Sequence, residues 1–209
     1  MKKLQILLFL IIPMVLMNCD KKPEGADAKT GDSVEKKEVK GNSMPLNLEK
    51  SSLRWTGRKV TMNHTGTVKI KEGNVVLDGD KITGGKVVID MSTIVDEDLT
   101  NPEYKNKLET HLKSEDFFDI EKFPTSTFEI VTVTDPTADG SVNITGNLEI
   151  RGISKSITVP AKIEIDENKK PTAASTKFNI DRTDWGIVYK GMADDLIANE
   201  VNFDLKLSL

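Results

Sequence analysis

The fold is decided by residues 142–165, which read VNITGNLEIRGISKSITVPAKIEI. Apolar and polar residues alternate here in two runs, 142–150 and 157–165, and Gly146 stands at one of the apolar positions. Alternation with a period of two is the pattern of a β-strand that buries one face and exposes the other. The stretch therefore predicts two amphipathic strands.

The same alternation recurs over the rest of the chain beyond Pro45. It is equally regular at residues 201–209, and weaker copies lie at residues 53–55, 68–70 with 75–77, 87–89, 128–130 and 176–180. Residues that favour turns punctuate the series at Gly73-Asn74, Asp78-Gly79-Asp80, Asp139-Gly140 and 168–171. The pattern predicts an all-β domain of about eight strands.

Two arrangements can bury one face of so many strands: an antiparallel sheet closed into a barrel, or two packed layers. The last run, 201–209, is as regular as the interior ones and carries no charge on its apolar face. A strand at the edge of an open sheet is normally protected by such a charge. We therefore expect an eight-stranded antiparallel β-barrel over residues 46–209.

One segment breaks the alternation. Pro102-Glu103 has the composition of a helix start, because proline fits the first helical position and an early acidic residue suits the helix dipole. The residues that then share one helical face are Tyr104, Leu108, His111 and Leu112. We expect a short helix at about residues 103–112 that covers one mouth of the barrel.

The N-terminus carries an export signal. Lys2 and Lys3 are followed, after two residues, by an uncharged run from Ile6 to Met17, which is typical of a signal peptide and too short to span a bilayer. Leu16 stands three positions before Cys19, which resembles the lipobox of bacterial lipoproteins. We expect residues 1–18 to be removed and an acylated Cys19 to hold the protein on a membrane of the cell envelope, with the domain facing the periplasm or the exterior.

The segment after Cys19 has the composition of a spacer. Residues 20–50 hold no aromatic residue, and seven lysines alternate with seven acidic residues among small polar ones. Such a segment cannot bury enough apolar surface to offset its ordering entropy. We therefore expect residues 19–45 to form a lipidated cysteine and a disordered tether.

Charge and cysteine content narrow the function classes. Without Lys2 and Lys3, the 29 basic residues fall to 27 against 33 acidic ones, so the mature chain has a formal charge of −6. Nucleic-acid binding needs a basic patch, which argues against that class of partner. A lone cysteine also excludes an internal disulfide, so the domain must be stable through packing.

No motif for catalysis or for a cofactor is present. The two histidines, His64 and His111, lie 47 positions apart, and neither has a second histidine at zinc-ligand spacing. Neither a G-x-S-x-G motif nor a phosphate-binding glycine loop occurs. We expect a protein that is not an enzyme, with neither a metal nor a cofactor.

Two short segments have both a structural and a functional interpretation. Phe117 and Phe118 are adjacent, so they must lie on a turn or at a helix end, where they either plug the barrel or line a pocket entrance. In the segment from Asp181 to Gly186, Arg182 could pair with a carboxylate beneath the indole of Trp185. That pair would be either a structural corner or a site for a ligand head group.

Taken together, several segments resemble the YceI-like family in type and in order. They are Leu53-Arg54-Trp55-Thr56-Gly57, His64-Thr65-Gly66, residues 111–119 (HLKSEDFFD), residues 123–128 (FPTSTF), Gly146-Asn147-Leu148, Arg151-Gly152 and residues 181–185 (DRTDW). The resemblance spans nearly all of residues 46–209. It implies a lipocalin-like barrel whose apolar channel accommodates a polyisoprenoid chain, in proteins that are usually periplasmic, and it implies no reaction.

The resemblance also suggests which residues would contact a ligand: Trp55, His64, His111, Phe117, Phe118, Phe128, Arg182 and Trp185. We expect the ligand to be a polyisoprenoid or a quinone-like lipid, and the protein to act as its carrier or reservoir in the envelope. The alternative is an envelope stress or interaction module that uses the barrel as a scaffold. The sequence leaves open whether the barrel is filled or hollow, and whether the protein is a monomer or a homodimer.

Overall fold

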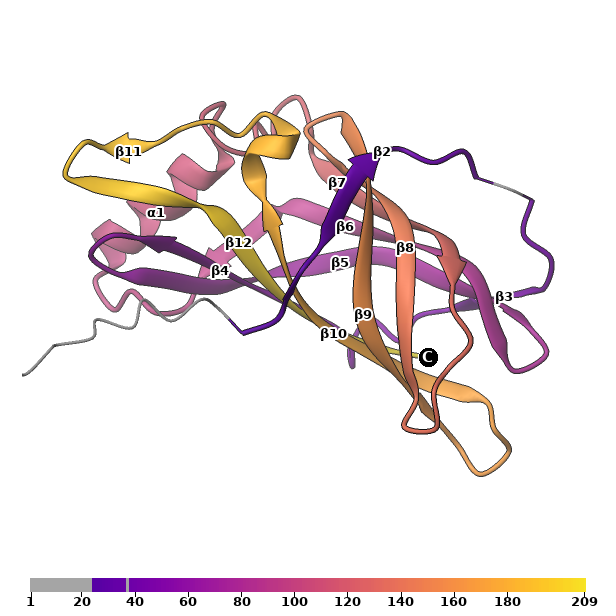
Figure 1. Ribbon diagram of the computed structural model, residues 1–209. Helices are drawn as coiled ribbons and strands as arrows, with labels where there is room; N and C mark the ends of the chain where they lie inside the picture. The colour runs from indigo at the N-terminus through magenta and orange to yellow at the C-terminus, as the bar shows by residue number, and fades with distance from the viewer. Residues whose placement is uncertain (1–23, 37) are drawn as a thin grey trace, which may run out of the picture.

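Eight strands form a closed antiparallel barrel in the computed structural model, which describes residues 24–36 and 38–209 (Figure 1). In chain order these are β4 (Ser52–Lys59), β5 (Asn63–Asp78), β6 (Lys81–Asp96), β7 (Thr125–Val133), β8 (Ser141–Ile150), β9 (Ile153–Ile165), β10 (Pro171–Asp181) and β12 (Asp195–Ser208). Strands β4 to β9 pair in sequence, β12 lies between β10 and β4, and β9 pairs with β10 to close the barrel. The predicted all-β, eight-stranded antiparallel barrel is confirmed.

The alternation that predicted the strands sets their inner and outer faces. In β9, Val159 and Ala161 are buried, whereas Pro160 and Lys162 between and after them are exposed. Strands β8 and β9 form a hairpin around Arg151 and Gly152, whose φ angles are 52° and 71°. Positive φ at both residues of a two-residue loop gives the twist that antiparallel strands favour.

Strand β5 differs from the prediction at Gly73-Asn74. No turn forms there, and β5 runs straight through both residues as one strand of 16 residues. Gly73 instead makes room for packing, because a Cβ at this position would lie 2.6 Å from Cδ1 of Leu46. A glycine required for close packing cannot be told from a turn glycine by residue type alone.

The single α-helix of the described residues lies where it was expected. Helix α1 (Pro102–Lys113) starts at Asn101, whose side chain accepts hydrogen bonds from the backbone N–H groups of Glu103 and Tyr104. It packs beside β6 at one mouth of the barrel (Figure 1). Tyr104 was predicted to share one helical face with Leu108, His111 and Leu112; those three line the cavity, whereas Tyr104 is 60% exposed. No helix in the described part of the chain has the length and apolar character needed to cross a membrane.

The predicted tether contacts the barrel over the part that the structure describes. Cys19 and the predicted signal peptide lie outside the described residues. Strand β1 (Ala26–Asp27) pairs in parallel with β10, and β2 (Lys29–Asp32) pairs with β9 (Figure 1). Strands β9 and β10 pair with each other only over residues 162–165 of β9 and 171–175 of β10. Beyond this region β1 and β2 lie between the two strands, β1 on β10 and β2 on β9. Strand β3 (Asn42–Pro45) then pairs with β5.

The contacts of β1, β2 and β3 explain why the polar composition of this segment did not reveal that it pairs with the barrel. They are mainly backbone hydrogen bonds to strand edges, and all four residues of β2 stay exposed to solvent. Side chains of the barrel add to them; Asn147, for example, accepts from the N–H of Val34 at 2.9 Å and donates to its carbonyl at 2.7 Å. Pairing through the backbone requires no apolar side chains, so a polar composition does not exclude it.

Candidate functional site

The barrel is hollow. It encloses a cavity of about 530 Å³, which lies in the range of about 300–1,000 Å³ typical of small-molecule sites. An eight-stranded barrel is just large enough either to be filled by its own side chains or to hold one ligand. The cavity volume answers the question that the sequence left open, in favour of a barrel with room for a ligand.

The cavity is long, and its wall is apolar. In β12 the inward residues Val201, Phe203, Leu205 and Leu207 all line it. At about 3.3 Å per residue, these positions span about 20 Å along the strand. Inward residues of β8 and β9 also line the cavity, among them Leu148 and Ile157. The space therefore suits a slender apolar molecule.

Aromatic rings gather at the end of the cavity under α1. Phe117 and Phe118 lie in the turn after the helix, as predicted, and both line the cavity. The ring of His111 meets Phe117 and Tyr189 edge-on, with centroids 4.9 and 4.8 Å away, and its Nε2 lies 3.0 Å from Oδ2 of Asp116. The ring thus brings polar atoms to this end of the cavity.

Two further aromatic residues are held in the wall by glycines on neighbouring strands. A Cβ at Gly146 would lie 2.5 Å from Cζ of Phe128, and a Cβ at Gly66 would lie 2.7 Å from the indole of Trp55. Each glycine thus leaves the space that the ring fills. Nε1 of Trp55 has no hydrogen-bond partner among the described residues.

The structure brings seven of the eight predicted ligand-contact residues to the cavity wall. They are Trp55, His64, His111, Phe117, Phe118, Phe128 and Arg182. The eighth residue, Trp185, does not line the cavity, which corrects the prediction for this position. It lies in the 3₁₀ turn η1 (Arg182–Trp185) with no exposed surface, outside the cavity lining, and its Nε1 donates to the carbonyl of Leu148 at 3.0 Å.

Arg182 reaches the cavity but does not form the expected ion pair with a carboxylate. Its guanidinium donates to three backbone carbonyls: Ala198 at 3.0 Å, Ile187 at 2.5 Å and Ile197 at 3.3 Å. Burial lowers the pKa of Arg182 below its ordinary value. Five fixed donors make arginine well suited to such a clamp, which here joins η1 to the start of β12.

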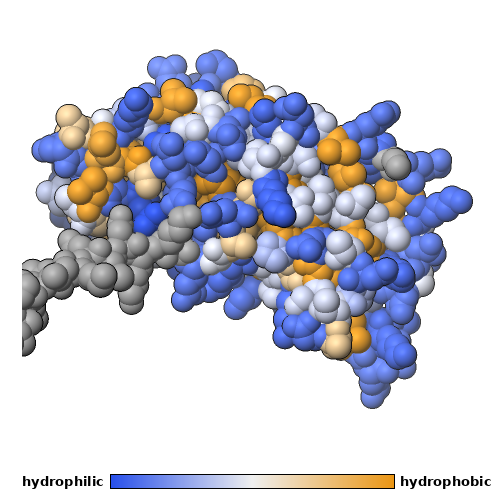
Figure 2. Space-filling model, viewed as in Figure 1, coloured by the Kyte–Doolittle hydropathy of each residue, from blue (hydrophilic) through white to orange (hydrophobic). Residues whose placement is uncertain are grey.

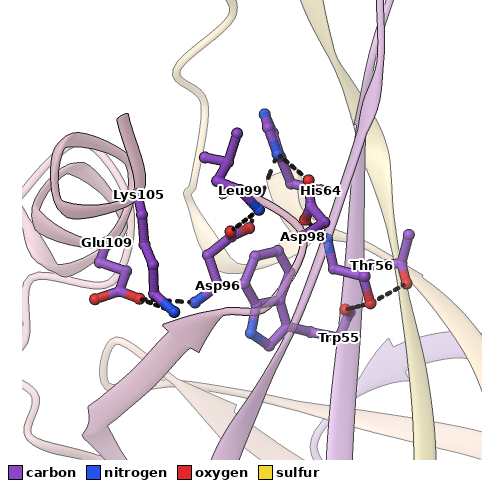
Figure 3. A network of polar contacts seen from close by, with 9 residues as sticks. Trp55, Thr56, His64, Asp96, Asp98, Leu99, Lys105 and Glu109 are labelled. Atoms are coloured by element: carbon purple, nitrogen blue, oxygen red, sulfur yellow. Dashed lines mark hydrogen bonds and ion pairs between the residues drawn. The ribbon is translucent and has the colours of Figure 1, made fainter. Parts of the chain in front are cut away.

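A polar cluster at the same end was not predicted. Nδ1 of His64, in β5, lies 3.1 Å from Oδ2 of Asp98 and 3.8 Å from Oδ2 of Asp96 at the end of β6 (Figure 3). The second oxygens accept backbone hydrogen bonds, Asp96 from Leu99 and Asp98 from Thr65. Sequence spacing could not reveal this cluster, because pairing of β5 with β6 brings together residues more than 30 positions apart.

The two carboxyl groups have opposite pKa shifts. Burial raises the pKa of Asp96, and the neighbouring Asp98 carboxyl raises it further. Burial also acts to raise the pKa of Asp98, but the hydrogen bond from the Thr65 backbone N–H, together with the neighbouring Asp96 and His64, outweighs it and leaves that pKa below its usual value. Asp98 therefore carries the negative charge of the pair more readily than Asp96.

Comparisons with known proteins agree with the barrel. Residues 45–209 match the model of the YceI-like domain family. The chain is 35% identical over 107 residues to a UPF0312 protein of Ectopseudomonas mendocina, covering 51% of this chain and 52% of the relative. It is 29% identical over 137 residues to a UPF0312 protein of Shewanella denitrificans, covering 65% and 68%. The chain thus spans about half the length of the first relative.

A solved structure shows the same fold. The crystal structure of Burkholderia cenocepacia BcnA aligns with a TM-score of 0.63 at 21% sequence identity. The alignment covers 78% of this chain and 99% of BcnA. Nearly the whole of BcnA therefore has a counterpart in the barrel described above.

Proposed function

The chain belongs to the YceI-like domain family, and on that premise we propose that it binds an isoprenoid lipid, either a polyisoprenoid or an isoprenoid quinone, inside the barrel. The barrel of this family is a binding fold rather than a catalytic one, and it is consistent with an apolar ligand. The observation that carries the proposal is the elongated apolar cavity of about 530 Å³.

The shape of the cavity favours a chain over a compact molecule. Its wall follows β12 over several successive inward positions, and Phe203 and Leu207 stand well apart along that strand. A chain ligand would bury apolar surface along this length, at about 25 cal/mol for each Å² removed from water. Polar atoms of His64 and His111 lie at the α1 end, where a head group would be placed.

Native mass spectrometry of the purified protein tests this proposal. We expect a bound species that is released by organic extraction and identified as an isoprenoid lipid. Protein stripped of lipid should take up one chain per barrel when an isoprenoid quinone is supplied. A barrel that is repeatedly recovered without ligand, and that does not take up an added isoprenoid, would contradict the proposal.

We also propose that the barrel exchanges its ligand with a bilayer, on which acylated Cys19 would hold it. Met192 supports this, because its side chain both lines the cavity and is 67% exposed. Figure 2 shows apolar side chains on the surface at this end, where β11 (Gly191–Met192) turns into β12. The exposed apolar residues of these neighbouring loops are Val60, Met62, Val188, Met192 and Leu196. An exposed apolar patch beside a ligand entrance is typical of a membrane contact.

The apolar loops give a prediction for membrane binding. In protein that begins at residue 20, and so lacks the acyl anchor, Met192→Glu should weaken sedimentation with lipid vesicles about 10- to 100-fold. Burying a methionine contributes about 1.5–3 kcal/mol, and the glutamate adds a charge that membranes exclude. Ile165→Glu is the control, because Ile165 is 59% exposed at the opposite end of the barrel. Equal binding by both variants would show that these loops do not contact the bilayer.

A further inference from the structure

Three side chains at the α1 end of the barrel aim metal-ligand atoms at one point. They are His64 with Nδ1, Asp96 with Oδ2 and Asp98 with Oδ2, and these atoms all lie within 4.8 Å of one another (Figure 3). Each comes from a fixed backbone position, since His64 lies in β5, Asp96 ends β6 and Asp98 follows two residues later. The arrangement is independent of the lipid cavity wall, except that His64 also reaches the cavity.

Backbone hydrogen bonds hold both carboxylates in this orientation. Oδ1 of Asp96 accepts from the N–H of Leu99 at 2.8 Å, and Oδ1 of Asp98 accepts from the N–H of Thr65 at 2.6 Å. One oxygen of each group is thereby fixed, and the other is turned towards His64. Outer contacts of this kind commonly orient the ligands of metal sites.

Asp96 provides a second, independent observation. Its side chain has no exposed surface, and its Oδ2 has no hydrogen-bond partner among the described residues. A buried carboxylate oxygen without a partner is unfavourable, and such an atom in a folded protein calls for an explanation. A cation held between this oxygen and the other two ligand atoms supplies one.

We propose that His64, Asp96 and Asp98 bind a divalent cation of the class represented by Zn²⁺. One imidazole and two carboxylates suit zinc and its first-row neighbours better than they suit calcium, which takes oxygen ligands only. Metal–ligand distances of about 2.0–2.2 Å place neighbouring ligand atoms about 3.0–3.5 Å apart, close to the observed 3.1 and 3.8 Å. His64 and Asp98 are partly exposed, so water can complete the coordination.

A cation at this point would join three parts of the barrel mouth. His64 is in β5, and the two aspartates lie where β6 leads towards α1. Thr65, which donates to Asp98 through its backbone, also donates through Oγ1 to the carbonyl of Trp55 in β4. Metal binding should therefore stabilise the folded barrel, by an amount that rises with the free metal concentration.

Calorimetric titration of ZnCl₂ into EDTA-treated mature protein tests the site. We expect one Zn²⁺ per chain and a higher melting temperature with metal. Asp98→Asn and His64→Gln should each lower the affinity at least about 100-fold, since even outer-shell partners account for about 10- to 100-fold. Neither residue is fully buried, so both variants should fold, which circular dichroism checks.

Glu97→Gln is the matched control. Glu97 lies between the two aspartates, but its carboxylate pairs with Arg54 and Thr67 on another side. This variant should keep the wild-type affinity and the metal-dependent rise in melting temperature. Absence of saturable binding in the wild-type protein, or equal binding by Asp98→Asn and Glu97→Gln, would overturn the proposed site. Because the readout is metal binding, its outcome does not depend on whether the barrel holds a lipid.

Discussion

Ala161→Phe is expected to abolish lipid binding while leaving the barrel folded. Ala161 is buried in β9, and its side chain lines the cavity. A phenylalanine here would project six additional carbon atoms into the space that the ligand needs. We expect the affinity for an isoprenoid lipid to fall at least about 100-fold, which corresponds to about 2.8 kcal/mol.

The same substitution should not reduce stability, and this separates loss of the ligand space from unfolding. In a full core, an enlarged side chain costs about 1–3 kcal/mol, whereas filling a cavity commonly contributes about 0.5–2 kcal/mol of stability. We therefore expect an unchanged or higher melting temperature for the lipid-free variant. Titration with a fluorescent isoprenoid quinone measures the affinity, and thermal unfolding measures the stability.

Lys162→Phe is the control for this experiment. Lys162 follows Ala161 in the same strand but is exposed on the outer face. It should bind lipid like the wild-type protein. If Ala161→Phe kept both lipid binding and cellular function, the ligand would not lie in the barrel. If it lost lipid but kept cellular function, the barrel would serve as a scaffold, which is the alternative inferred from the sequence.

The barrel could be predicted from the sequence because its signal is local. Each strand shows its inner face through alternating residues such as Val159 and Ala161, whatever its partners are. The structure differs from the prediction where a residue's conformation depends on a contact with a distant part of the chain. Gly73 is required by Leu46, which lies on another segment, and the N-terminal segment pairs through its backbone. Neither contact leaves a periodic pattern in the sequence.

The sequence predicted some site residues correctly and missed others, because their positions also depend on contacts between distant parts of the chain. Aromatic residues in a barrel can face the cavity or pack in the core, and the residue type is the same in both cases. The adjacent Phe117 and Phe118 were correctly placed on a turn, because alternation forbids them one face of a strand. The cluster of His64 with Asp96 and Asp98 depends on strand register, which only the folded barrel defines.

Trp185 offers the strongest test of this distinction between cavity wall and supporting core. It has no exposed surface, lies outside the cavity lining and donates a hydrogen bond to the carbonyl of Leu148. Trp185→Ala should lower the free energy of unfolding by about 3–5 kcal/mol, because it removes a large buried side chain and leaves a cavity. Trp185→Phe should lower it less, since a ring remains, but the Leu148 carbonyl loses its partner.

Measuring lipid affinity distinguishes a structural role of Trp185 from a role in contacting the ligand. Under conditions where Trp185→Phe is folded, its affinity for an isoprenoid quinone should stay within about threefold of wild type, because no cavity contact is removed. Urea unfolding and lipid titration on the same samples provide the two measurements. A large loss of lipid affinity with little loss of stability would show that Trp185 contacts the ligand, and it would contradict the structural role. The expected result instead makes the turn from Arg182 to Trp185 a support that holds the cavity wall, including Leu148, in place.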